Sequence, residues 1–260
     1  MTSATTVAWD PFDTEIDTDP HPMWKRMRDE TPVYRNDTYD FYALSRYHDV
    51  EAAHRDPSTF SSARGTVLEL MGNDLSGTGQ LIFLDPPEHT QLRHLVSRAF
   101  TPRRTADLED RVRGFCAQML DAQRDRDHFD YLQDFGAKLP SMVISSLLGV
   151  PDEDRETFRH LVDGMFHIEP GVGMVNEPAL EAGGQVSRYL ARLMDQRREE
   201  AQDDLLTALA QAGLTRVQGT EFATLLLAAG TETVARLLGW AAVVLAREPD
   251  QRSLLVDDPS

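Results

Sequence analysis

The chain has 260 residues, enough for one large domain or two small ones with a buried core. Its 41% hydrophobic and 27% charged residues are typical of a soluble globular protein and exclude a disordered or collagen-like chain. The 43 acidic and 26 basic residues give a formal net charge of −17, which repels nucleic-acid phosphates and anionic lipid surfaces. We therefore expect neither nucleic acid nor a membrane as a partner.

The chain contains one cysteine, Cys116, which excludes an intrachain disulfide and every multi-cysteine metal motif. It lies among Phe115, Met119 and Leu120 in a predicted helix, so we interpret it as a core residue and expect no metal ligand here. A single thiol suits a reducing compartment, and the acidic first 25 residues lack the basic start and apolar stretch of a secretory signal. We therefore expect a cytoplasmic protein.

The first sixty residues predict a small unit of helices and strands. A short helix is expected over residues 22–29, and two strands are expected over 33–35 and 41–44. Ser45 is expected to cap a helix that runs through Arg55. The fold class predicted for the whole chain is mainly α with this small β-sheet.

Residues 56–80 hold four glycines and few periodic apolar side chains, which predicts a long, mobile loop. Beyond residue 100 the chain predicts mainly helices. Apolar periodicity and turn residues place one beginning at Thr101-Pro102, one ending at Leu148 before Gly149, others over 152–166, 179–200 and from 203, and breaks at Gly213 and Gly219.

The most apolar stretch, residues 222–246, is long enough to cross a bilayer. It carries Glu232 and Arg236 near its middle, and each such charge costs about 2.5 to 3.5 kcal/mol on membrane-insertion scales. We therefore interpret it as a buried helix of a soluble protein.

Residues 85–100 read Asp-Pro-Pro-Glu-His-Thr-Gln-Leu-Arg-His-Leu-Val-Ser-Arg-Ala-Phe and predict a helix capped by Asp85. His89 and Arg93 lie one turn apart at the edge of its apolar stripe, where they could bind an anionic group. His94 and Arg98 point toward solvent. A boundary pair bonded to neighbouring carboxylates explains the same spacing, and the spacing alone favours that alternative.

The centre of the apolar helix reads Ala-Gly-Thr-Glu-Thr over residues 229–233. Gly230 costs about 1 kcal/mol relative to alanine in a helix, and Thr233 can bond back to the carbonyl of Ala229. Small side chains let a flat ligand approach the backbone, and Glu232 with Thr233 could pass protons to it. The alternative is close helix packing at Gly230 with a surface pair between Glu232 and Arg236.

Together these two segments resemble the cytochrome P-450 family of haem-thiolate monooxygenases in its soluble bacterial form. Residues 85–103 resemble the family's C helix, and residues 229–233 resemble its oxygen-binding I helix, in the expected order. Shorter matches extend the resemblance over nearly the whole chain, at 56–62, 147–155, 203–208 and 248–252. The resemblance implies one incomplete P-450 domain over residues 1–260, truncated after the helix that follows the I helix.

The resemblance also implies roles for particular residues. His89 and Arg93 would bind a propionate of haem b. Ala229 and Gly230 would pack over the haem face where dioxygen binds. Glu232 and Thr233 would deliver protons during cleavage of the O–O bond, so that one oxygen atom enters a C–H bond of a small apolar substrate.

The implied partners are a ferredoxin and a ferredoxin reductase as electron donors. Arg98, Arg103 and Arg104 could form a local basic patch for an acidic ferredoxin, and solvated surface arginines are the alternative. The resemblance further suggests that residues 65–80 and 164–176 form the roof of the substrate pocket.

Two family features do not occur in the 260 residues: a helix with a Glu-x-x-Arg motif after the I helix, and the loop whose cysteine ligates the iron. Glu156 and Arg159 match the first spacing in an earlier polar helix, which we interpret as chance. We therefore expect an enzyme portion without its iron ligand, with weak haem binding and poor solubility because the apolar helix keeps an uncovered face. The alternative is a non-catalytic helical scaffold or a decayed enzyme.

Overall fold

The computed structural model describes residues 7–72, 74–100, 102–169 and 172–258, leaving aside the side chains of residues 102–105 and 107. Its contacts group the chain into two units, Met1–Ser61 and Ser62–Ser260. The expectation of a single domain over the whole chain stays a prediction.

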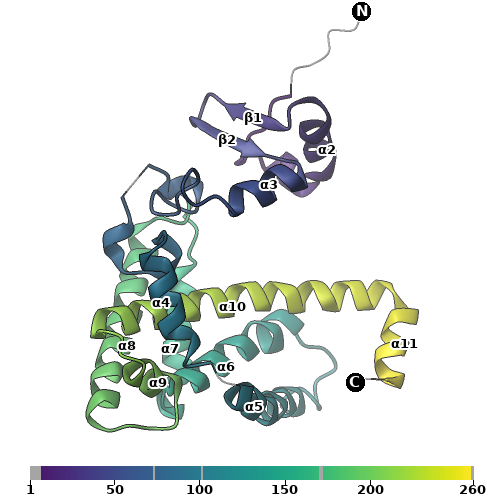
Figure 1. The fold of residues 1–260 in the computed structure, drawn as a ribbon. Coiled ribbons are helices and arrows are strands. Elements are labelled where there is room, and N and C mark those ends of the chain that lie inside the picture. The colour runs from purple at the N-terminus through teal and green to yellow at the C-terminus, as the bar shows by residue number, and fades with distance from the viewer. Residues whose placement is uncertain (1–6, 73, 101, 170–171, 259–260) are drawn as a thin grey trace, which may run out of the picture. The chain divides into compact units, whose positions relative to one another are not determined.

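The first unit contains a two-stranded antiparallel sheet (Figure 1). β1 (Val33–Asn36) pairs with β2 (Phe41–Leu44), which places Val33 opposite Leu44. The helices of this unit are α1 (Thr14–Thr18), α2 (His21–Glu30) and α3 (Tyr47–His54). The predicted strands and the helix at 22–29 are confirmed to within one residue at each end.

The second unit is helical. Its α-helices are α4 (Glu88–Ser97), α5 (Pro102–Asp121), α6 (Lys138–Leu148), α7 (Arg155–Met165), α8 (Glu177–Glu199), α9 (Leu205–Gln211), α10 (Arg216–Arg247) and α11 (Pro249–Asp257). Short turns connect them: the 3-10 helices η1 (Leu68–Leu70), η2 (Ser76–Thr78), η3 (Leu81–Phe83) and η5 (Asp152–Asp154), and the π-helical turn η4 (Leu132–Gly136). The mainly α fold with a small sheet is confirmed.

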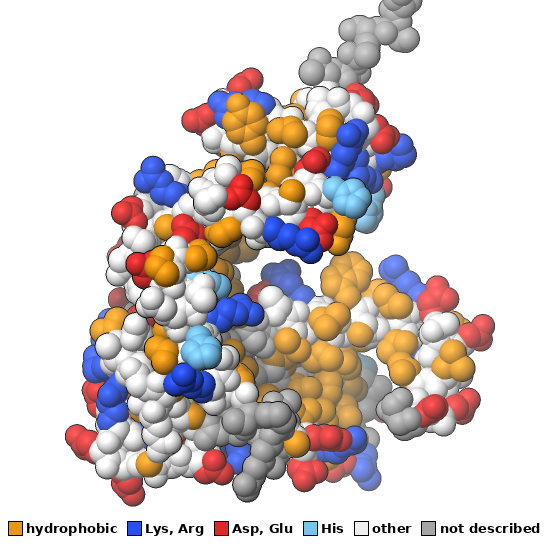
Figure 2. All heavy atoms as spheres, viewed as in Figure 1, with side chains coloured by type: hydrophobic (Ala, Val, Ile, Leu, Met, Phe, Trp, Pro, Cys, Tyr) orange, Lys and Arg blue, Asp and Glu red, His pale blue; other side chains and the backbone are white. Residues whose placement is uncertain are grey.

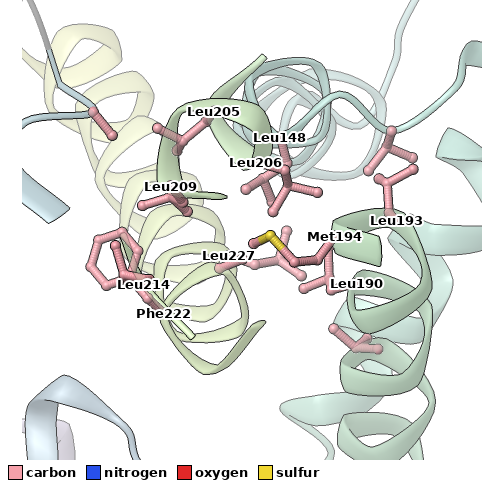
Figure 3. Packing of buried hydrophobic residues seen from close by; sticks show 14 of the residues in the cluster. Leu148, Leu190, Leu193, Met194, Leu205, Leu206, Leu209, Leu214, Phe222 and Leu227 are labelled. Atoms are coloured by element: carbon pink, nitrogen blue, oxygen red, sulfur yellow. The ribbon is translucent and has the colours of Figure 1, made fainter. Parts of the chain in front are cut away.

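One hydrophobic core joins α4 with α6 to α10. Met194 of α8 lies at its centre, with fully buried leucines from four helices around it (Figure 3): Leu148, Leu190, Leu206, Leu209 and Leu227. Burying a side chain of this size contributes about 1.5 to 3 kcal/mol. This core determines which faces of α4 and α10 remain outside it.

Two predicted helix caps are wrong. The hydroxyl of Ser45 donates to the carbonyl of Pro32 at 3.2 Å, and α3 begins after Arg46 without a side-chain cap. Asp85 accepts a hydrogen bond from the amide of Ser62 at 2.9 Å, and α4 begins after Pro87 without a side-chain cap. Both polar side chains are used by tertiary contacts that sequence periodicity does not reveal. The cap expected at Thr101 lies outside the described residues.

The break predicted at Gly219 is also wrong. α10 begins earlier, where Thr215 and Gln218 form a reciprocal capping box. A Cβ atom on Gly219 would lie 2.6 Å from Cε of Met194. The glycine therefore permits close packing of α8 against α10 and does not end a helix. By contrast, Gly149 has φ +81° directly after α6, as predicted for a helix stop.

α10 is long and apolar enough to cross a membrane by length and composition, and a core helix of a soluble protein meets the same criteria. One face packs against α6 and α8. The opposite face of its second half is apolar and exposed, with Leu237 and Trp240 each 66% exposed and Val244 50% exposed. Figure 2 shows hydrophobic side chains gathered along this helix. The predicted uncovered face is therefore present.

Replacing Leu237 and Trp240 together by serine is expected to raise the monomeric fraction of the protein, because contiguous exposed apolar patches promote self-association. Light scattering coupled to gel filtration measures that fraction. Val217→Ser is the control, since Val217 is 59% exposed on the same helix but outside this stripe. An unchanged monomeric fraction in the double variant would contradict the expectation.

Candidate functional site

α4 is oriented by its buried side. Leu92 and Val96 are each 4% exposed and belong to the same core cluster as Leu227 of α10. Just after α4, the ring of Phe100 meets the ring of Phe222 edge-on, with centroids 6.2 Å apart. The apolar stripe predicted for residues 85–100 is therefore confirmed, and it ties α4 to the helix that carries the second motif.

The two cation pairs of α4 have different surroundings. His94 and Arg98 are both exposed, and Nη2 of Arg98 lies 3.1 Å from Nε2 of His94. His89 is half-buried and Arg93 is exposed. Within the described part of the chain, neither His89 nor Arg93 forms a hydrogen bond or an ion pair. The carboxylates required by the structural alternative are thus not found among the described residues.

The second motif lies in the middle of α10, where Ala229 and Thr233 face outward. Both residues are exposed, and the hydroxyl of Thr233 donates to the carbonyl of Ala229 at 2.7 Å. The predicted back-bond is therefore confirmed. At 100° per residue, Ala229 and Thr233 fall on the same exposed stripe as Leu237 and Trp240. The small side chains of the motif leave the backbone of this stripe open.

Gly230 faces another helix. A Cβ atom at this position would lie 2.9 Å from Cδ1 of Ile144, so the glycine permits close packing of α6 against α10. One turn further on, Nε of Arg236 donates to Oε1 of Glu232 at 2.7 Å. Both contacts of the packing alternative are therefore present at Gly230 and Glu232. Only Ala229 and Thr233 of the motif are exposed on the stripe.

Glu232 lies near a charged cluster on α7 that the sequence reasoning missed. Arg159 donates to Glu156 at 2.9 Å and to Asp163 at 2.5 Å. Burial raises the pKa of Asp163, Arg159 opposes that shift, and the negative charge of Glu232 adds to it. The i,i+4 spacing of Arg159 and Asp163 could have predicted their pairing, but their approach to α10 depends on tertiary packing.

The two loops expected over the pocket contact each other. Residues 62–75 close on themselves, since the amide of Gly72 donates to the carbonyl of Arg64 and the amide of Leu75 to the carbonyl of Ala63, both at 2.9 Å. This segment is thus a compact turn of backbone hydrogen bonds rather than an extended loop. A Cβ atom on Gly173 would lie 3.6 Å from Oε1 of Glu69, which brings the loop before α8 against η1.

The described residues contain no group of three or more histidine, cysteine, aspartate or glutamate side chains suited to a metal ion. Cys116 is half-buried beside Met119 and Phe135, and burial raises the pKa of its thiol, in keeping with the core interpretation. The side chains of Arg103 and Arg104 lie outside what the structure describes. The basic patch proposed with Arg98 stays a prediction.

No protein-family model matches the chain. Curated relatives include cytochrome P-450 130 of Mycobacterium tuberculosis, 37% identical over 92% of this chain, and vitamin D(3) 25-hydroxylase of Pseudonocardia autotrophica, 33% identical over 100% of it. The chain spans 63% and 66% of their respective lengths.

Solved structures of bacterial proteins have the same fold. The ligand-free cytochrome P-450 TbtJ1 matches 93% of this chain with a TM-score of 0.81 and 32% identity, and the chain covers 63% of it. The bacillaene polyketide synthase cytochrome P-450 PksS of Bacillus subtilis matches 97% with a TM-score of 0.83 and 28% identity, and the chain covers 66% of it. These similarities over nearly all of its length show that the chain belongs to the cytochrome P-450 family.

Proposed function

We propose that α4 and α10 supply the haem-contacting surfaces of a monooxygenase that inserts one oxygen atom of dioxygen into a C–H bond of a small apolar substrate. Family membership implies haem as the cofactor. The observation that carries the proposal is the difference between the two cation pairs of α4. His94 and Arg98 lie against each other, whereas His89 and Arg93 have no partner among the described residues.

The donor chemistry of these residues fits haem. An imidazole and a guanidinium are suitable donors for a propionate carboxylate, and the guanidinium can bind it through two parallel hydrogen bonds. On α10, Ala229 and Thr233 place only small side chains on the exposed stripe, which a flat macrocycle can approach closely. When bound, haem supplies the centre at which dioxygen is activated.

The side chains of α10 would move protons. Thr233 holds its own hydroxyl proton against the carbonyl of Ala229 and keeps its oxygen lone pairs available as acceptors. Glu232 is half-buried and held by Arg236, an exposed side chain. Opening of this ion pair would free the carboxylate to take a proton from solvent and pass it to Thr233.

The remaining proposals concern partners. A relative named as a vitamin D(3) 25-hydroxylase supports hydroxylation of an apolar molecule as the reaction class. We propose a ferredoxin and its reductase as the electron donors, with docking on a patch that includes Arg98, Arg103 and Arg104. The reducing environment suited to the single thiol supports a cytoplasmic location.

Ala229→Phe tests the α10 surface. The phenyl ring would cover the stripe that a macrocycle must approach, so we expect haem affinity to fall at least about tenfold, equivalent to about 1.4 kcal/mol. The measurement is a titration with haem followed by its absorbance. Ala246→Phe is the control, because Ala246 is exposed on α10 but off the stripe. Equal affinities of both variants and the unaltered protein would contradict the proposal.

The second candidate function is a non-catalytic helical scaffold. The contacts of Gly230 with Ile144 and of Glu232 with Arg236 favour it, because they explain the motif by packing alone. A scaffold needs no haem, so the same titration separates the two functions. Absence of saturable haem binding by the unaltered protein would favour the scaffold.

A further inference from the structure

One carboxylate on α10 joins three segments that are far apart in the sequence. Nε2 of Gln80 donates to Oε2 of Glu221 at 3.1 Å, and the hydroxyl of Ser187 on α8 donates to Oε1 of the same side chain at 3.4 Å. Gly79 lies directly above: with φ +77°, a Cβ atom there would be 3.8 Å from Val217 and 3.9 Å from Glu221. Glu221 therefore holds the end of the 62–80 segment against α8 and α10.

The 62–80 segment is closed at its base as well. The amide of Ser62 donates to Oδ1 of Asp85 at 2.9 Å, which brings the beginning of the segment to the start of α4. Together with the internal backbone bonds of Gly72 and Leu75, this contact makes the segment an Ω-type loop that can move as one body.

Little apolar burial holds this loop in place. No described residue between 62 and 80 is fully buried, and Met71 is 50% exposed. Segments with few buried apolar contacts open with low free energy, so individual polar contacts determine how often they open. In the described part of the chain, the Glu221 carboxylate receives hydrogen bonds from neutral donors and forms no ion pair.

We propose that Glu221 is a clasp that keeps the 62–80 loop closed over α8 and α10, and that release of the clasp opens the roof of the substrate pocket. The link to a substrate pocket rests on the proposed function. The clasp itself rests on the contacts of Gln80, Ser187 and Glu221. Glu69 beside Gly173 would transmit the movement to the loop that precedes α8.

Hydrogen–deuterium exchange of the 260-residue protein tests the clasp. In Glu221→Ala we expect the amides of residues 63–80 to exchange about tenfold faster, with unchanged exchange in the second half of α10. Gln80→Ala removes the contact from the loop side and should give the same result without altering a helix. Glu181→Ala is the control, because its partners Gln185 and Arg188 lie on its own helix, α8.

The double variant Gln80→Ala with Glu221→Ala should exchange no faster than either single variant, because both substitutions remove the same contact. Unchanged exchange of residues 63–80 in the single variants would overturn the clasp. So would faster exchange spread evenly over α8, α9 and α10. The measurement uses neither haem nor substrate, so a failure of haem binding would refute the proposed function and leave this result standing.

Discussion

Replacing Asp204 with alanine is expected to lower the free energy of unfolding by about 3 to 5 kcal/mol, because it leaves a buried guanidinium without its counter-ion. The side chains of Arg197 and Asp204 are only 6% and 5% exposed and form an ion pair. Nη2 of Arg197 also donates to the carbonyl of Gly149 at 2.9 Å, and Asp204 caps α9 by accepting from the amide of Thr207 at 2.8 Å. The pair therefore links the ends of α6, α8 and α9.

Urea unfolding followed by circular dichroism measures this loss. Asp204→Asn separates the charge from the cap, since asparagine still caps a helix but cannot neutralise Arg197. Asp195→Ala is the matched control: its pair with Arg216 spans 2.7 Å, but the two side chains are 47% and 51% exposed. We expect the control to lose less than about 1 kcal/mol. Equal losses for Asp204→Ala and Asp195→Ala would contradict the account.

The second large effect is expected for haem affinity. Replacing His89 or Arg93 by alanine should weaken haem binding about 10- to 100-fold, since a hydrogen bond to a charged group contributes about 1.5 to 3 kcal/mol. The matched control is the replacement of His94 or Arg98, which are the same residue types on the same helix but lie against each other on its exposed side. Equal losses in both pairs would show that α4 contributes only through its overall charge.

The local pattern of α4 was predictable because helical periodicity depends on neighbouring residues alone. The stripe that contains Leu92 and Val96 is buried, and His94 and Arg98 are exposed, as 100° per residue requires. The back-bond of Thr233 was predictable for the same reason, since its acceptor lies four residues earlier on the same helix.

Contacts between distant segments were not predictable from these patterns. Gly219 looked like a helix break, and its reason for being glycine becomes visible only when Met194 of α8 lies against it. Asp85 looked like a cap, but its partner is the amide of Ser62. The Glu221 contacts likewise require the fold, because Gln80 and Ser187 are far from it in sequence.

The central claim is that α4 binds the carboxylates of haem through His89 and Arg93. Comparing haem with its dimethyl ester, which lacks the propionate charges, tests this claim most directly. The account predicts that the unaltered protein binds haem at least about tenfold more tightly than the ester, by the same hydrogen-bond contribution. It also predicts that the double variant His89→Ala with Arg93→Ala binds both compounds equally. Equal affinities of the unaltered protein for haem and its ester would contradict the account.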